Sequence, residues 1–171
     1  MGFIIREAVK ADMPQVLGLI RELAVFENEA QAVEVTIADL EHDGFGPKKL
    51  FHCFVGESEG AIAGIALVYP RYSTWKGPAL HLEDLIVTEK MRGSGLGGAL
   101  LTEVVKYGHK LGVKRINWEV LDWNENAISF YESKGAKVLR DWDVVQLDEN
   151  GIRNYLGNIK DMDFPVQGNE K

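Results

Sequence analysis

Cysteine is almost absent from this sequence, and so are the features that would place the chain in a membrane. The single cysteine, Cys53, has no partner for a disulfide within the chain, and its apolar setting FHCFV predicts a buried core residue and not a nucleophile. No run of about eighteen apolar residues occurs, which argues against a membrane-spanning helix. The first twelve residues lack the basic region and apolar run of a secretory signal, so we expect a cytoplasmic protein.

Positive charge is also in short supply. The chain has 19 Lys and Arg against 26 Asp and Glu, for a net charge of −7. Because phosphate backbones are bound by concentrated basic surfaces, this balance argues against a nucleic-acid partner and favours a cationic one. The four histidines are scattered without the spacing of metal ligands, so no metal site is expected; they are His42, His52, His81 and His109.

The apolar residues, 46% of the chain, are sufficient for one substantial core. We found no repeat and no long linker, so we expect a single domain over residues 1–164 and a polar tail over residues 165–171. Apolar spacing predicts a helix after Asp12, with Gln15 completing a capping box, and a shorter helix from Thr36, capped with Asp39, to about Gly44. The further predicted elements are strands over 2–7, 80–87, 115–121 and 142–147, a β-hairpin over 51–57 and 62–72, and helices from about 96 to 111 and over 124–134.

A glycine-rich segment, Arg92-Gly93-Ser94-Gly95-Leu96-Gly97, separates the strand over 80–87 from the helix that follows it. At the start of a helix several backbone N–H groups have no intrahelical acceptor and point outward together. Glycines let the backbone approach a pyrophosphate closely, and the positive end of the helix dipole favours the anion. The segment therefore predicts a site for a phosphate-bearing cofactor.

Two other phosphate-binding motifs fit this segment less well. Gly93, Gly95 and Gly98 have the spacing of the dinucleotide fingerprint, and Glu119 lies where a ribose-binding acid would be expected. In that motif, however, the strand leads almost directly into the first glycine, whereas residues 88–92 intervene here, and the rest of the chain is too short for a second nucleotide-binding half. No G-K-[ST] follows the glycines, which excludes a P-loop.

The order of strand, R-x-x-G-x-G, helix and strand, followed by Asn124 and by Phe130-Tyr131-x-x-x-Gly135, resembles the GNAT acetyltransferases. Segments such as Phe26-Glu27, Asp43-Gly44-Phe45-Gly46 and Leu82-Glu83-Asp84 extend the resemblance to the branch of spermidine/spermine and thialysine N-acetyltransferases, over most of the chain up to about Trp142. The resemblance implies an α/β fold with a mixed, mostly antiparallel sheet, a splayed central strand pair and flanking helices, and it implies a homodimer.

The resemblance also implies a set of residues for acetyl-CoA. In the family, the backbone of a splayed strand pairs with the pantetheine arm, and here the matching positions are Leu85, Ile86 and Val87. The pyrophosphate would bind the amides of Arg92 to Gly97, Ser94 would add a hydroxyl donor, and Asn124 would lie near the pantetheine. Tyr131 matches the residue that donates a proton to the CoA sulfur, although its place on an apolar helix face is also typical of a core tyrosine.

Acetyl transfer to an amine needs a neutral amine, because only about one alkylammonium in a thousand is deprotonated at pH 7. Glu83 is the candidate base, acting through a water, although an exposed or salt-bridged strand residue is the simpler interpretation of a lone carboxylate. Glu27 and Asp84 match acidic positions that bind the cationic substrate in the polyamine branch, and Trp142 is placed to add a cation–π wall. We found no Cys or Ser with a His partner at a recognised spacing, so direct attack on the thioester is favoured.

The expected activity is therefore transfer of acetyl from acetyl-CoA to a small cationic amine. A polyamine, a diamine, thialysine and a lysine-like amino acid all remain open as substrates, because Phe26 and Asn28 replace tyrosines of the polyamine enzymes. Two alternatives also remain open. One is acetylation of a protein N-terminus or lysine, and the other is a non-catalytic module that binds acyl-CoA.

Overall fold

The computed structural model describes residues 2–159 and divides the chain into two compact units, Met1–Glu119 and Val120–Lys171. The first unit contains β1 (Ile4–Glu7), the 3₁₀ helix η1 (Lys10–Asp12), α1 (Met13–Phe26), α2 (Ile37–Phe45), β2 (His52–Ser58), β3 (Ala61–Ser73), β4 (Gly77–Val87), the 3₁₀ helix η2 (Glu89–Met91), α3 (Leu96–Lys110) and β5 (Ile116–Asn117). The second unit contains α4 (Glu125–Ser133) and α5 (Glu149–Ile159). The expected tail over 165–171 lies outside the described residues.

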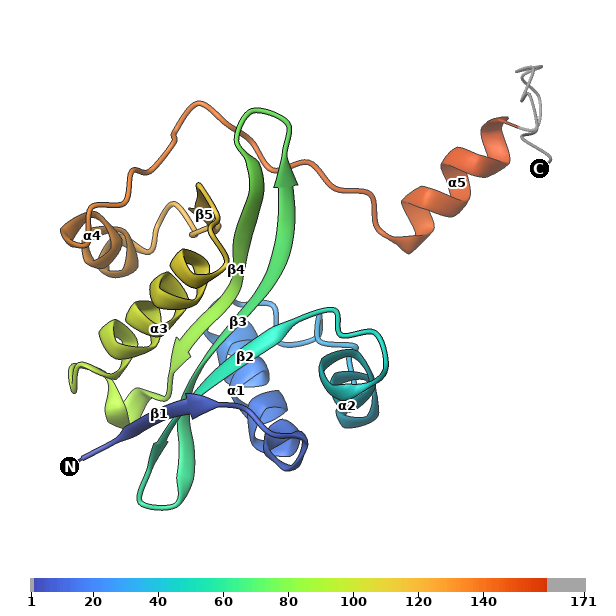
Figure 1. Cartoon of the computed structure of the whole chain (residues 1–171). Coiled ribbons are helices and arrows are strands. Elements are labelled where there is room, and N and C mark those ends of the chain that lie inside the picture. Colours follow the sequence, from blue (N-terminus) through green and yellow to red (C-terminus); the bar gives the residue numbers. More distant parts are fainter. Residues whose placement is uncertain (1, 160–171) are drawn as a thin grey trace. The chain divides into compact units, whose positions relative to one another are not determined.

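The strands of the first unit form one sheet in the order β1-β2-β3-β4-β5 (Figure 1). The first four strands are antiparallel neighbours, and β5 runs parallel to β4. The expected α/β fold with a mixed, mostly antiparallel sheet is therefore confirmed. The predicted hairpin is β2 and β3, whose turn has positive φ at Glu59 (53°) and at Gly60 (78°), as a tight hairpin turn requires.

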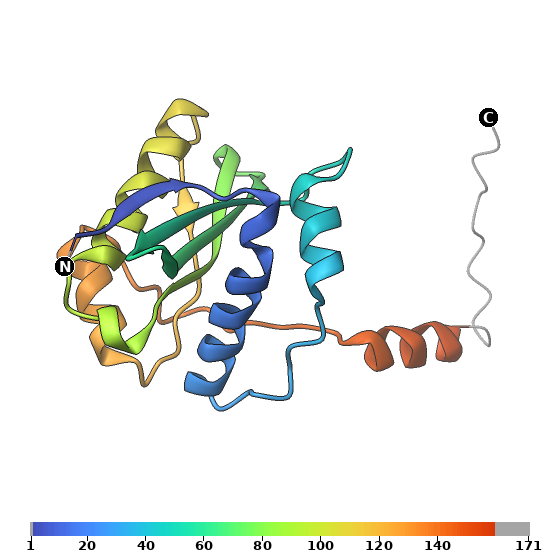
Figure 2. The same ribbon diagram turned by 90° about the horizontal axis from the view of Figure 1, so that it is seen from below.

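Helices cover both faces of this sheet. In Figures 1 and 2, α1 and α2 lie on one face and α3 lies on the other. The first face holds a buried cluster that includes Met13, Val16, Val55 and Ile65. On the other face α3 buries Leu96, Leu100, Leu101 and Val104. The apolar spacing predicted Leu100, Leu101 and Val104 on this face, but Val105 and Leu111, predicted with them, are exposed. Cys53 is buried as expected, and burial raises the pKa of its thiol to about 12, which is unsuited to a nucleophile.

The start of α1 differs from the expected capping box. The Asp12 carboxylate does not cap the helix. It accepts hydrogen bonds from both terminal nitrogens of Arg6, at 2.6 and 3.0 Å, and from the Val9 N–H, at 2.8 Å. Gln15 Oε1 accepts the Ile62 N–H at 2.9 Å and so joins α1 to β3. The prediction was wrong because Arg6, on β1, offers the carboxylate two charge-assisted bonds, which are stronger than one bond to a helix amide.

The other predicted helix starts are confirmed. The Thr36 hydroxyl accepts the Asp39 N–H at 3.2 Å, and the Asp39 carboxylate accepts the Thr36 N–H at 2.9 Å, which is the reciprocal capping box of α2. Asn124 Oδ1 accepts the Ala127 N–H at 3.2 Å and caps α4. Gly112 (φ 70°) follows α3, and Gly135 (φ 88°) follows α4, as expected for helix C-termini.

Two predicted strands differ from the structure. The strand expected over 115–121 is reduced to the two residues of β5, and residues 142–147 form no strand. The side chains of Trp142, Val144, Val145 and Leu147 are exposed. Apolar alternation predicts a strand only where a neighbouring strand accepts its hydrogen bonds, and no strand pairs with these residues among the described ones. Helix α5, which follows them, was not expected.

We expect Gly64→Ala to destabilise the protein by about 1–3 kcal/mol, because an added Cβ would lie 2.9 Å from the Ile86 carbonyl oxygen and 3.0 Å from Leu100 in a packed core. Gly18→Ala is the matched control, since its Cβ would meet nothing within 4 Å and alanine favours the interior of α1 by about 0.5–1 kcal/mol. Urea unfolding measures both changes. Equal stability of the two variants would contradict the packing of β3 against β4 and α3.

Candidate active site

Glu83 occupies a β-bulge in the middle of β4. Along β3 the neighbours Leu67 and Val68 pair with Asp84 and Leu82, so two residues of β3 face three residues of β4 and Glu83 is the extra one. A bulge bends its strand and redirects the side chain of the extra residue. Glu83 accordingly has a side chain 53% exposed in an otherwise largely buried strand. This position suits a group that must meet both solvent and a ligand.

The pairing between β4 and β5 ends just before this bulge. The two strands pair in parallel at Leu80 with Ile116 and at His81 with Asn117, and no further pair follows among the described residues. From Leu82 to Val87, β4 is paired with β3 on one side, and β5 does not pair with its other side. The expected splayed strand pair is thus confirmed. Leu85, Ile86 and Val87 lie in the part of β4 that does not pair with β5.

The glycine-rich segment follows β4 after the short 3₁₀ helix η2. Gly93 and Gly95 have φ values of 76° and 89°, the left-handed region that glycine adopts without strain, and neither would place a Cβ within 4 Å of another group. The Ala99 N–H bonds the Gly95 carbonyl as the first turn of α3 closes, so the amides of Gly97 and Gly98 precede the intrahelical ladder. The segment therefore has the geometry of an anion site at a helix N-terminus.

Arg92 and Ser94 support the shape of this segment. Arg92 Nε donates to the Val87 carbonyl at 3.3 Å, and its guanidinium lies over the Phe26 ring at 5.2 Å from the centroid. The Ser94 hydroxyl donates to the Met91 carbonyl at 2.6 Å and accepts the Leu96 N–H at 3.4 Å. The serine side chain thus holds the turn together from within, and its role as a cofactor donor stays a prediction.

An acidic cluster lies beside the bulge. Burial, together with the charges of Glu83 and Glu27, raises the pKa of Asp84 to about 6. Burial also raises the pKa of Glu27, at the C-terminal end of α1. Three of the predicted site residues are therefore close enough to interact electrostatically, although they come from two elements. Such a cluster is stabilised by a cation, which would offset both the mutual repulsion and the cost of burial.

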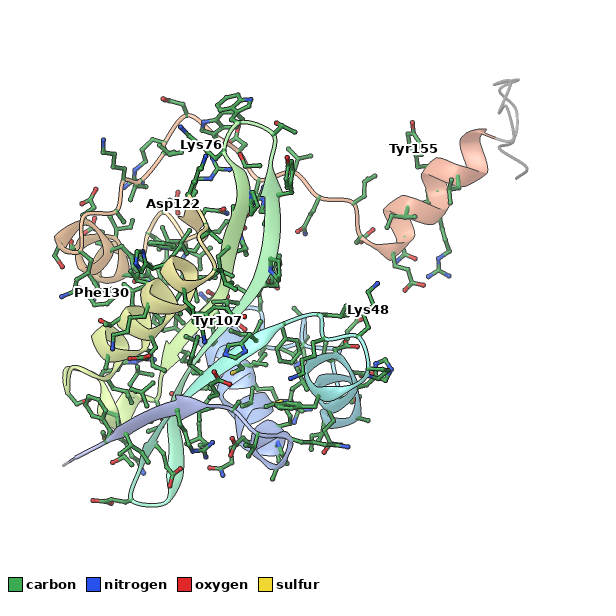
Figure 3. All side chains as sticks on the ribbon, viewed as in Figure 1. Lys48, Lys76, Tyr107, Asp122, Phe130 and Tyr155 are labelled. Carbon is green, nitrogen blue, oxygen red and sulfur yellow. The ribbon has the colours of Figure 1, made fainter. Side chains whose placement is uncertain are left out.

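The remaining predicted residues belong to the second unit. Asn124 caps α4, and Tyr131 is buried on that helix with its ring tilted against Phe130, a residue labelled in Figure 3. Burial raises the pKa of Tyr131 to about 12, so the phenol keeps its proton at neutral pH. Trp142 is 69% exposed and lies in the segment without regular structure. Their roles toward the cofactor and the substrate stay predictions.

Side chains that the sequence did not single out surround Glu83. His81, on the same strand, has Nε2 3.6 Å from Glu83 Oε2, and Asn117 Nδ2 on β5 lies 2.8 Å from His81 Nδ1. Burial raises the pKa of Tyr69, and so do the charge of Glu83 and a hydrogen bond with it. The one signal in the sequence that could have placed His81 beside Glu83 is their separation of two residues, because residues two apart on a strand share a face.

Comparison with known proteins assigns the chain to the family that the sequence motifs resemble. The model of the Acetyltransferase (GNAT) family matches residues 8–136. The chain belongs to the GNAT acetyltransferase family. It is an acetyl-CoA-dependent N-acetyltransferase. This bears out the predicted family, the predicted enzyme class and acetyl-CoA as the co-substrate.

Relatives of this GNAT enzyme act on small amines, as their names state. A thialysine N-epsilon-acetyltransferase of Bos taurus is 35% identical over 92% of this chain and 99% of its own length. The L-ornithine N5-acetyltransferase NATA1 of Arabidopsis thaliana is 36% identical over 73% of this chain and 52% of its own length. An integron cassette protein of V. cholerae has the same fold, with a TM-score of 0.75 at 21% identity over 91% of this chain and 98% of that one.

The remaining expectations concern metal ions, membrane spans, oligomeric state, cellular location and domain boundaries. Among residues 2–159 no group of three or more His, Cys, Asp or Glu side chains is arranged to hold a metal ion. No helix in the same range is long and apolar enough to cross a membrane. The homodimer, the cytoplasmic location and the single-domain boundaries stay predictions.

The raised pKa of Asp84 leads to a prediction for stability. The folded protein holds the Asp84 proton more tightly than the unfolded chain, whose aspartate pKa is about 3.9, so stability falls as the pH rises from about 4 to 6 and stays lower above that range. We expect Asp84→Asn to remove this loss and to be more stable than the unchanged protein at pH 7, by up to roughly 3 kcal/mol. At pH 4 and below the two should be equal.

Urea unfolding between pH 3.5 and 8 measures this difference. The exposed Asp141 provides the control, because Asp141→Asn removes a carboxylate without relieving a buried charge. A pH-independent difference between Asp84→Asn and the unchanged protein would contradict the buried state of Asp84.

Proposed function

We propose that this enzyme transfers the acetyl group of acetyl-CoA to the primary amine of a small cationic molecule, in the class of thialysine, ornithine, lysine or a polyamine. The observation that carries the proposal is the partly buried acidic pair Asp84 and Glu27 beside Glu83, just after the last residue of β4 that pairs with β5. A buried carboxylate that costs stability is retained where a ligand offsets that cost. A cation of the size of an amino acid or polyamine suits this cluster.

The cofactor would lie along β4 and against the start of α3. The main chain of Leu85, Ile86 and Val87 would pair with the pantetheine arm, because β5 does not pair with that side of the strand. The backbone amides of Arg92 to Gly97 would hold the pyrophosphate, with the positive end of α3 adding to the attraction. Asn124 would lie near the pantetheine, as the family motif implies.

The reaction then follows as a direct attack. The substrate ammonium loses a proton to Glu83 through a water, and the neutral nitrogen attacks the acetyl carbonyl carbon. The new C–N bond forms as the C–S bond breaks, and the departing CoA thiolate takes the proton of the Tyr131 phenol. The proton that the attacking nitrogen still loses to become an amide returns through solvent to the Tyr131 phenolate, and the Glu83 carboxyl releases its proton to solvent, so both groups are restored. Glu83 suits the first step because its bulge exposes it, and Tyr131 suits the last because its phenol stays protonated at neutral pH.

The substrate class is tested by incubating the enzyme with acetyl-CoA and a panel of amines while measuring released thiol. We expect turnover of one or more of thialysine, ornithine, lysine, putrescine and spermidine, and a loss of that turnover in Asp84→Asn through a raised KM, because a cation contact is removed. Acetylation of peptide N-termini or peptide lysines alone would overturn the small-amine proposal. Tight CoA binding with no acetyl transfer to any amine would favour a binding module.

The glycine segment is tested by Gly95→Ala. Alanine at φ 89° costs about 1–2 kcal/mol and tilts the first amides of α3, so we expect CoA affinity to fall roughly tenfold or more in calorimetric titration. Gly77→Ala is the matched control, since Gly77 has φ 82° in the turn at the opposite end of β4. Equal CoA affinities of the two variants would remove this segment from the cofactor site.

The role of Tyr131 is tested by Tyr131→Phe. The variant lacks the proton donor and keeps the ring, so we expect kcat to fall by roughly 100-fold or more while CoA affinity stays nearly unchanged. Tyr155→Phe serves as the control, because Tyr155 is exposed on α5, as Figure 3 shows. An unaltered kcat in Tyr131→Phe would remove Tyr131 from the mechanism.

A further inference from the structure

His81 is a buried imidazole beside the proposed base, and the mechanism above gives it no part. It is 5% exposed on β4, and its side chain lies among groups from three strands. Tyr69 of β3 packs against its ring in a tilted arrangement, with the centroids 4.9 Å apart. Arg71 of β3 and Asn117 of β5 both approach its Nδ1. Its other nitrogen, Nε2, faces Glu83 at 3.6 Å.

These contacts select one tautomer of the ring. The nitrogen Nδ1 lies 2.8 Å from Asn117 Nδ2 and 3.5 Å from Arg71 Nη1. The guanidinium has donors only, so Nδ1 must act as the acceptor, and the same reasoning orients the Asn117 amide with its NH₂ toward the ring. A neutral imidazole that accepts at Nδ1 carries its proton on Nε2. That N–H therefore faces the Glu83 carboxylate.

The electrostatic surroundings keep this ring neutral. Burial lowers the pKa of His81, and the charge of Arg71 lowers it further, while the carboxylates of Glu83 and Glu119 oppose that change. Protonation of Nδ1 would also direct a new N–H at the Asn117 amide and the Arg71 guanidinium, both donors. The ring is thus held neutral with its Nε2–H directed toward Glu83, at a distance of 3.6 Å from Glu83 Oε2, and it does not serve as the base at neutral pH.

We propose that His81 is a positioning residue that orients the Glu83 carboxylate for proton abstraction, acting together with the Tyr69 hydroxyl; the proposal rests on the proposed function. Glu83 sits in a bulge with its side chain half exposed, so strand packing alone does not select its rotamer. The hydrogen bond with Tyr69 and the N–H of His81 restrict the carboxylate, and its remaining oxygen lone pairs face the water and the substrate amine. Orientation of this kind changes the rate more than the binding of either substrate.

Two substitutions of His81 test the roles of its two ring nitrogens separately. In His81→Asn the amide oxygen can replace Nδ1 as the acceptor for Asn117 and Arg71, while the donor toward Glu83 is lost. In His81→Gln the longer amide can place an N–H near the position of Nε2 and retain that donor. We expect His81→Asn to lower kcat by roughly tenfold or more with little change in KM for acetyl-CoA, and His81→Gln to recover most of that loss. The control His42→Asn, at an exposed histidine on α2, should leave kcat unchanged.

A double-mutant cycle links the effect to Glu83. In the Glu83→Gln background the further change His81→Asn should have little effect on kcat, because there is no carboxylate left to orient. Equal fractional losses in both backgrounds would overturn the proposal and assign His81 a purely structural role. If Glu83→Gln itself retains the full rate, the proposed base is wrong. If Glu83→Gln loses rate and His81→Asn does not, only the inference about His81 fails.

A second measurement does not depend on turnover of any amine. Nitrogen-15 NMR of the histidine rings in the whole protein should report His81 at pH 7 as the neutral tautomer with the proton on Nε2. The pKa of His81 should fall in Glu83→Gln, because the carboxylate that raises it is removed while Arg71 and Glu119 remain. A proton on Nδ1, or an unchanged pKa in that variant, would overturn the proposal even if the panel yields no substrate.

Discussion

The site depends on one constraint in the sheet, namely that β4 remains paired with β3 along its length while it pairs with β5 only at Leu80 and His81. Past that point one edge of β4 is left without β5. The bulge at Glu83 falls just after the last pair and redirects that carboxylate out of the ladder. Beyond β4, the helix η2 leads to the glycine segment, from which α3 begins (Figure 1). The first amides of α3 precede the intrahelical ladder. The path of β4 therefore determines where the candidate cofactor-binding residues and the candidate base lie.

Electrostatics add a cost that the fold alone does not require. Asp84 and Glu27 are partly buried carboxylates that repel each other, and no basic side chain is among the groups that perturb either pKa. Elsewhere in the same unit the buried Asp12 is paired with Arg6, which lowers its pKa and makes it a stabilising group. The two aspartates therefore differ: Asp12 belongs to a structural ion pair, whereas Asp84 has no basic side chain among the groups that shift its pKa.

Local signals in the sequence predicted the local features well. The Thr36 capping box, the Asn124 cap and the Glu59-Gly60 turn each depend on a few neighbouring residues, and each is confirmed. The failures involve partners that are distant or absent. Asp12 is bound by Arg6 from β1, and the apolar alternation over 142–147 has no paired strand among the described residues. The site residues on β4 could be predicted from the family motif, whereas the bulge and the His81 contacts depend on the register between three strands, which no local pattern encodes.

In the proposed function the fold provides the positions for acetyl-CoA, and a few side chains determine which amine is accepted. In the proposed function the Asp84 carboxyl, whose pKa of about 6 is near neutrality, is ionised most fully when a cation binds beside it. Substrate binding then releases a fraction of a proton from Asp84, while Glu83 in the neighbouring bulge takes up the proton of the amine. In this proposal the two adjacent carboxylates have separate roles: Asp84 binds the positive charge of the substrate, and Glu83 removes a proton from its amine.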